Sequence, residues 1–78
     1  MNETPGAALR RMRLEAGLPQ KALAETLGIS PQYMSDIESG SRALPRHIIS
    51  RMPKKIKSAV VKALKSAMQT QIDELDTQ

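Results

Sequence analysis

The 78-residue sequence contains no cysteine, tryptophan or phenylalanine, and it has one tyrosine and one histidine. Without cysteine the chain forms neither a disulfide nor a thiolate metal site, and one histidine cannot build a histidine-rich site. A chain this short buries only about 60% of the surface that its unfolded form exposes. Its stability must therefore come from good packing of aliphatic residues and five methionines, or from oligomerisation.

Long apolar runs are also missing, since none reaches the roughly 18 residues that a membrane span requires. The N-terminus lacks the charged-then-apolar pattern of a secretory signal. We therefore expect a cytoplasmic protein with no membrane partner. The single aromatic residue, Tyr33, argues against RNA modules that stack several bases on aromatic side chains.

Catalytic signatures are absent as well. His47 is the only histidine and lies on a predicted short helix near Arg46 and Arg51, which is typical of a surface or half-buried residue rather than a proton carrier. There is no metal-ligand spacing, no phosphate-binding glycine loop and no serine with an evident base. We predict a protein that is not an enzyme and that binds no metal, cofactor or small-molecule ligand.

Basic residues predominate: twelve lysines and arginines against eight acidic residues give a net charge of +4 and a pI near 9.9. The excess lies in residues 1–65, because the last thirteen residues contain three acidic residues and no basic one. A small basic body with an acidic tail points to a polyanionic partner.

Glycines and prolines divide the chain into five predicted helices. Gly17, Gly28 and Gly40 each follow a stretch with helical spacing, where a left-handed residue commonly ends a helix. This predicts helices over 5–16, 20–27 and 31–39, the third with Ser30 as its N-cap and Pro31 at its first position. A short helix over 45–52 and a long one over 54–75 follow. The expected fold class is all-α.

The last predicted helix has more apolar residues than one stripe requires. Ile56, Val60, Ala63 and Ala67 form a face suited to the domain's own core. A second stripe is suited to a homodimer contact; it consists of Val61, Leu64, Met68, Ile72 and Leu75. The alternative is one wide buried face on a monomer. The predicted division is a first part over 1–53 and a helix over 54–78 that completes the core and ends in an acidic, frayed tail.

The stretch QKALAETLGISPQYMSDI, residues 20–37, indicates two helices joined by a very short turn. Such helices cross steeply, which requires a small residue at the contact, a left-handed residue in the turn and an apolar residue after it. Ala24, Gly28 and Ile29 supply these three. Together with four larger apolar residues, the pattern is moderately specific for a helix-turn-helix.

Residues 9–45, LRRMRLEAGLPQKALAETLGISPQYMSDIESGSRALP, resemble the lambda-repressor-like, or XRE, helix-turn-helix family, which includes phage Cro proteins and repressors. The resemblance implies a small five-helix domain that places the helix over 30–39 in the DNA major groove. Two positions depart from the family pattern. Pro19 replaces the usual capping Ser or Thr, and Pro31 stands where relatives often carry a polar base-contacting side chain.

The resemblance and the helix geometry assign roles to individual residues. Candidate base contacts are Pro31, Gln32, Tyr33, Ser35 and Asp36. Gln32 can pair with adenine, whereas Asp36 can accept a hydrogen bond from cytosine but repels phosphate. Candidate phosphate contacts are Arg10, Gln20, Lys21, Ser39, Ser41, Arg42 and Arg46. The resemblance also implies an internal ion pair between Arg13 and Glu38.

The resulting hypothesis is a sequence-specific regulator of double-stranded DNA: a small dimeric repressor of phage or mobile-element type on an inverted repeat. Two alternatives remain open. One is a restriction-modification controller protein of similar size. The other is an antitoxin or adaptor whose C-terminal helix binds another protein. The five lysines of residues 54–65 are expected either to form a solvated face or to attract DNA at long range.

Overall fold

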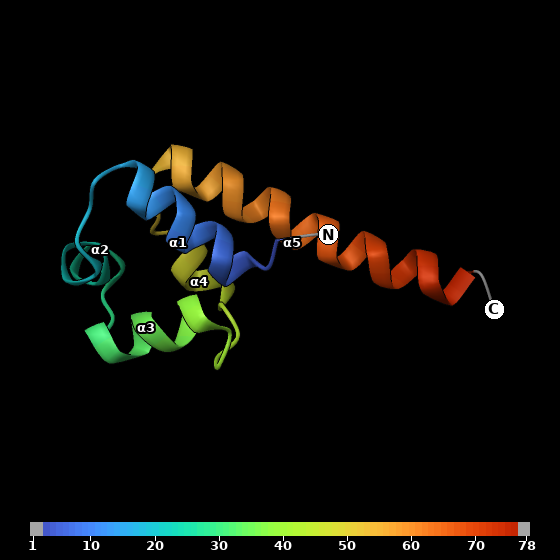
Figure 1. The fold of residues 1–78 in the computed structure, drawn as a ribbon, viewed down its shortest axis with the longest axis horizontal. Coiled ribbons are helices and arrows are strands. Elements are labelled where there is room, and N and C mark those ends of the chain that lie inside the picture. The colour runs from blue at the N-terminus through green and yellow to red at the C-terminus, as the bar shows by residue number, and fades with distance from the viewer. Residues whose placement is uncertain (1–2, 77–78) are drawn as a thin grey trace.

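The computed structural model describes the backbone of residues 3–76 and the side chains of residues 3–66. Within these bounds the chain contains no strand. The predicted all-α, five-helix class is confirmed, and Figure 1 shows the arrangement. The helices are α1 (Pro5–Glu15), α2 (Gln20–Leu27), α3 (Pro31–Ser39), α4 (Arg46–Ile49) and α5 (Lys54–Asp76).

Helices α1 and α3 begin in the same way, with a hydroxyl side chain as N-cap and a proline directly after it. Thr4 and Ser30 are the N-caps, and their hydroxyl oxygens accept from the backbone N–H groups of Ala7 and Tyr33, each at 3.1 Å. A proline follows each cap at the first helical position, where its missing N–H has no intrahelical partner to lose. The predicted start of α3 is therefore confirmed.

The helix ends also follow the sequence pattern. Gly17, Gly28 and Gly40 all have positive φ, as their positions predicted. Helix α4 is shorter than the predicted 45–52, because it ends at Ile49 and gives way to a turn. The proline at position 53 accounts for part of this difference, since the residue before a proline is disfavoured in helical conformation.

A single apolar core joins all five helices. Its fully buried members include Leu9 from α1, Leu27 from α2, Ile37 from α3 and Ile48 from α4. Helix α5 contributes three residues of its predicted inner stripe, Ile56, Val60 and Ala63. The helix over 54–76 is thus part of the folding unit that presents α3.

Helix α5 is the longest element, and it lies beside α1 over its first half before extending past the rest of the molecule (Figure 1). Val61 and Leu64 of the predicted second stripe are partly buried against the core. The two residues line different hollows. Val61 lines a hollow among lysines on the outer side of α5, and Leu64 lines an apolar hollow with Leu44 and Ile49.

Gly6 permits a backbone contact between α1 and α3 that the sequence pattern does not indicate. A Cβ atom added at Gly6 would collide with the carbonyl oxygen of Ile37. Because that oxygen belongs to the backbone of α3, no side-chain rotation relieves the collision. Gly6 therefore sets how closely the two helices approach.

We predict that Gly6→Ala lowers the free energy of unfolding by about 3 kcal/mol, because the helices must move apart in a close-packed core. Gly17→Ala is the matched control: Gly17 has a φ of +71° but no atom within 4 Å of an added Cβ. Gly17→Ala should lower the free energy of unfolding by only about 1 kcal/mol, through backbone strain. Urea unfolding of both variants measures the difference, and equal losses would contradict a close contact at Gly6.

Candidate nucleic-acid interface

The joint between α2 and α3 is short and tightly closed. Gly28 ends α2 with a φ of 72°, and the Ile29 N–H then donates to the Ala24 carbonyl at 3.0 Å. Leu23, Ala24 and Leu27 of α2 are buried with Met34 and Ile37 of α3. The two helices are therefore held as one unit, and the outer side of α3 faces solvent.

Five side chains on this side of α3 were predicted to contact bases, and we call them the recognition face. Pro31 and Gln32 are exposed, whereas Tyr33, Ser35 and Asp36 are half-buried. All five remain accessible at the surface of the first two turns. These turns are the part of the helix that a major groove admits.

Hydrogen bonds link this face to the loop that follows α3. The Gln32 side-chain amide donates to Asp36 Oδ1 at 3.1 Å, and Arg42 Nε lies 3.4 Å from Asp36 Oδ2. The guanidinium carbon of Arg42 lies 5.3 Å from the centre of the Tyr33 ring. Asp36 is thus neutralised by a cation on its own surface, which lowers its repulsion of a phosphate backbone.

This network also fixes the orientation of the Gln32 side chain. A carboxylate only accepts hydrogen bonds, so the amide nitrogen of Gln32 must face Asp36. The Gln32 oxygen and the second N–H of the amide are left for another partner. Asp36 therefore orients a candidate base contact and a candidate phosphate contact at the same time.

Some of the predicted phosphate contacts lie beside this face: Arg42 contacts Tyr33 and Asp36, and Arg10, Gln20 and Ser39 line a hollow together with Ser35. Arg10, Lys21, Arg42 and Arg46 are exposed, and the hydroxyls of Ser39 and Ser41 lie 3.1 Å apart in the loop after α3. Helices α1, α2 and α3 enclose a hollow of about 300 Å³ beside them. The hollow is lined by Arg10, Gln20, Ser35, Glu38 and Ser39.

Beneath this hollow, a buried ion pair connects α1 to α3. Arg13 Nε and Nη2 lie 2.7 and 3.1 Å from the two carboxylate oxygens of Glu38. Arg13 also donates to the Leu18 carbonyl at 2.9 Å. Gln20 donates to Glu38 at 3.1 Å, so its side-chain amide already has a protein partner. Both charged residues are 8% exposed, so the pair is structural rather than available to DNA.

Comparison with known proteins agrees with this geometry. The sequence matches the helix-turn-helix domain family over residues 6–77. The chain belongs to the helix-turn-helix family. Its predicted resemblance to lambda-repressor-like proteins is confirmed, and the match covers α5 as well as the four preceding helices.

A solved structure of a gene regulator supports the assignment. The clp gene regulator ClgR from Corynebacterium glutamicum is 26% identical in sequence, with a TM-score of 0.68 over 94% of this chain and 81% of that chain. No curated protein sequence gives a significant match. The family and this neighbour together support a DNA-binding regulator, in which α2 and α3 are the helix-turn-helix unit.

Sequence reasoning missed one side chain that supports the helix-turn-helix unit. Arg51, in the turn after α4, donates to the Leu27 carbonyl at the end of α2 at 3.0 Å. A Cβ atom at Gly28 would lie 2.9 Å from the same guanidinium. Arg51 therefore caps α2 from a distance of 24 residues in sequence. No local spacing pattern indicates such a contact.

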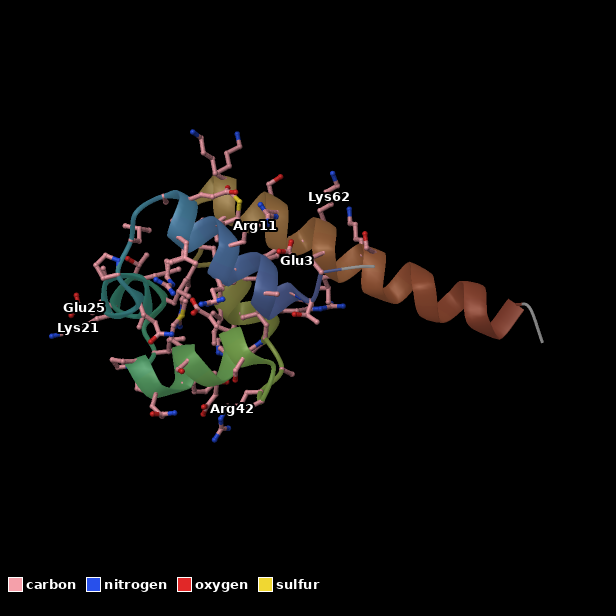
Figure 2. The ribbon with its side chains drawn as sticks, viewed as in Figure 1. Glu3, Arg11, Lys21, Glu25, Arg42 and Lys62 are labelled. Carbon is pink, nitrogen blue, oxygen red and sulfur yellow. The ribbon has the colours of Figure 1, made fainter. Side chains whose placement is uncertain are left out.

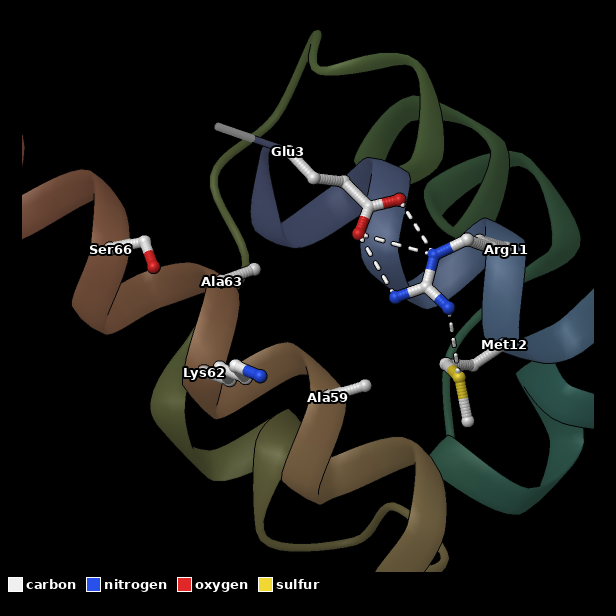
Figure 3. Close-up of a pocket in the computed structure, with 7 residues that line it drawn as sticks. All are labelled: Glu3, Arg11, Met12, Ala59, Lys62, Ala63 and Ser66. Carbon is white, nitrogen blue, oxygen red and sulfur yellow. Dashed lines mark hydrogen bonds and ion pairs between the residues drawn. The ribbon is translucent and has the colours of Figure 1, made fainter. Parts of the chain in front are cut away.

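A second hollow, of about 360 Å³, lies between α1 and α5 on the side away from α3 (Figure 3). Glu3 and Arg11 lie side by side at the α1 edge of the hollow, with Arg11 Nε 2.9 Å from the Glu3 carboxylate. The hydrogen bond from Arg11 lowers the pKa of Glu3, although partial desolvation opposes the shift. The charges of Glu3 and Arg11 largely cancel, and Lys62 of α5 is a further cation that lines the hollow.

The described residues contain neither a metal-ligand cluster nor a membrane-spanning helix. His47 is exposed, and no three acidic or histidine side chains in that part of the chain gather as metal ligands. None of the described helices combines the length and apolar character that crossing a bilayer requires. The recognition face and the residues around it are therefore the candidate site.

Removing one member of the Arg13–Glu38 pair should destabilise the helix-turn-helix domain strongly. Glu38→Ala leaves a buried guanidinium without its counter-charge, and we expect a loss of about 3 kcal/mol. The double variant Arg13→Met, Glu38→Leu should lose less unfolding free energy than the two single variants lose in total. Glu3→Ala, which breaks the exposed pair with Arg11, is the control and should change unfolding little. Additive losses in urea unfolding would contradict a coupled pair.

Proposed function

We propose that this protein is a sequence-specific transcriptional regulator that inserts α3 into the major groove of double-stranded DNA. The observation that carries the proposal is the recognition face, because its polar side chains are accessible on a helix fixed by a buried ion pair. Membership of the helix-turn-helix family and similarity to ClgR, a clp gene regulator, support the same function.

Base recognition is assigned to the outward residues of α3. Gln32 has the donor and acceptor atoms that pair with adenine, and Ser35 can bond with several bases. Pro31 has no donor and contacts a thymine methyl or shapes the backbone. Tyr33 supports Arg42 and faces the DNA edge, and Asp36 orients its neighbours or accepts from cytosine.

Phosphate contacts are assigned to side chains around that face. Arg42 extends from the loop after α3 with 60% of its side chain exposed, and Ser39 and Ser41 adjoin it. Arg10, Lys21 and Arg46 reach the backbone from α1, α2 and α4. Gln20 already bonds to Glu38, so its phosphate contact uses its remaining amide hydrogen or the backbone N–H groups at the start of α2.

A homodimer on an inverted repeat is the proposed assembly, as expected of a small repressor of phage or mobile-element type. The contact is assigned to α5, which extends beyond the domain (Figure 1). In a dimer contact centred on Val61, the lysines around it would face the same lysines of the second subunit and repel them. We therefore place the dimer contact toward the C-terminal end of α5. Met68, Ile72 and Leu75, also predicted for this interface, lie outside the residues whose side chains are described.

The adaptor or antitoxin alternative uses the same helix for a different partner, and a restriction-modification controller would share the DNA contacts. No enzymatic activity and no cofactor are included in the proposal, because a DNA-binding regulator of this kind requires neither. Selection of bound sites from a random duplex pool tests sequence specificity and supplies the operator for the variants below.

Variants of the recognition face should behave differently from variants of the phosphate contacts. Gln32→Ala should weaken the binding free energy for the selected operator by roughly 1 to 3 kcal/mol and change that for random DNA little. Arg42→Ala should weaken binding to both DNAs. It should also lower the slope of log binding constant against log salt concentration by about one per half-site. Because Arg42 also bonds to Asp36, we expect a smaller additional loss of specificity. Fluorescence anisotropy over a salt series measures these effects.

Half-site phasing tests the dimer on the same operator. Inserting about five base pairs between half-sites should weaken binding more than inserting about ten, because ten restores both sites to one duplex face. If Gln32→Ala and Arg42→Ala act alike on both DNAs and phasing has no effect, the repressor assignment is wrong. The adaptor alternative would then replace it.

A further inference from the structure

Most of the net positive charge of residues 3–66 lies on the first thirteen residues of α5, away from α3. Residues 3–53 contain seven basic and five acidic residues, a net charge of +2. Residues 54–66 contain five lysines and no acidic residue, a net charge of +5. The charge that attracts a polyanion is thus concentrated outside the helix-turn-helix unit.

Four of these lysines form one surface, which we call the lysine face: Lys54, Lys57, Lys62 and Lys65. They surround a hollow of about 530 Å³ whose other lining residues are Ser58 and Val61. All four are exposed, and none pairs with a carboxylate among residues 3–66. In contrast, four of the five acidic residues between 3 and 53 already have an arginine partner.

The lysine face and the recognition face lie on opposite sides of the molecule. Figure 2 shows Lys62 on one side and Arg42 on the other, along a direction in which the Cα atoms of the molecule extend over 22 Å. A separation of this order exceeds the Debye length of about 8 Å at physiological salt. The lysines are therefore largely screened from a duplex bound at α3, and they contribute little to holding it.

We propose that the lysine face binds a second segment of double-stranded DNA while α3 holds the first. Four flexible ammonium groups follow about 16 Å of helix axis from Lys54 to Lys65. A duplex carries one charge per roughly 1.7 Å, so phosphates meet every lysine along that length without a demand on sequence. The protein is then a bridge between a specific site and neighbouring DNA.

A duplex fits this face better than a protein partner does. Protein interfaces are depleted of lysine and depend on aromatic, arginine or other large anchors in buried pockets. The apolar part of the lysine face is Val61, which is small and already partly buried against the core. Long ammonium side chains around a shallow floor match phosphates, which require charge rather than shape.

The inference rests on the DNA binding proposed above, and a two-duplex capture experiment separates the two. The selected operator is immobilised, the full-length protein is added, and capture of a labelled random duplex from solution is measured at about 0.1 M salt. The wild-type protein should capture the second duplex. Lys57→Glu with Lys62→Glu should lower capture by about tenfold or more and leave operator binding within about threefold, because each lost phosphate contact matters strongly at this salt concentration.

Two further variants control for net charge and for folding. Arg10→Glu with Lys21→Glu makes the same change in net charge beside α3, and it should reduce operator binding itself. Lys57→Arg with Lys62→Arg retains the charges and should capture as the wild type does. Circular dichroism of each variant checks that the helices are intact.

The outcomes distinguish a failed inference from a failed function. Operator binding by the wild type without capture would overturn the lysine-face proposal and leave the regulator assignment standing. Capture that survives Lys57→Glu with Lys62→Glu would overturn it too, because the second duplex would then be held by the α3 of another copy. Absence of any operator complex would overturn the proposed function and the bridge together.

Discussion

The buried ion pair between Arg13 and Glu38 is the interaction on which the arrangement of the first three helices depends. Arg13 belongs to α1 and Glu38 to α3, and Gln20 at the start of α2 bonds to the same carboxylate. Two charges taken out of water are costly unless their hydrogen bonds are satisfied. Here no buried side-chain nitrogen or oxygen among the described residues lacks a partner. The cost of burial thus favours one orientation of α3, and misplacing the helix would leave a charge unpaired.

That orientation determines which side of α3 meets solvent, and the surface network refines it. Asp36 holds Gln32 and Arg42, and Arg42 lies over Tyr33, so several candidate DNA contacts are ordered before any DNA binds. Ordering side chains in advance lowers the entropy lost on binding. The acidic residue on the recognition face, which the sequence alone makes difficult to reconcile with DNA, is explained by its neighbours.

Features encoded by local sequence were predictable. The cap at Ser30, the left-handed glycines and the inner stripe of α5 depend on residues a few positions apart, where helical periodicity is informative. Arg13 and Glu38 lie 25 residues apart, and only the family resemblance implied their pairing. The contact of Gly6 with Ile37 and the bond from Arg51 to Leu27 have no local signal, because they depend on how the helices cross.

The site was predictable to a similar extent, since the helix and its exposed residues follow from the motif but the Asp36 network does not.

The most direct test of the central claim is an NMR titration of the isotope-labelled protein with its selected operator, followed at every backbone amide. The account predicts that the largest shifts occur in residues 31–36 and in the loop containing Ser41 and Arg42. Large shifts confined to α5, with the amides of α3 unchanged, would contradict it.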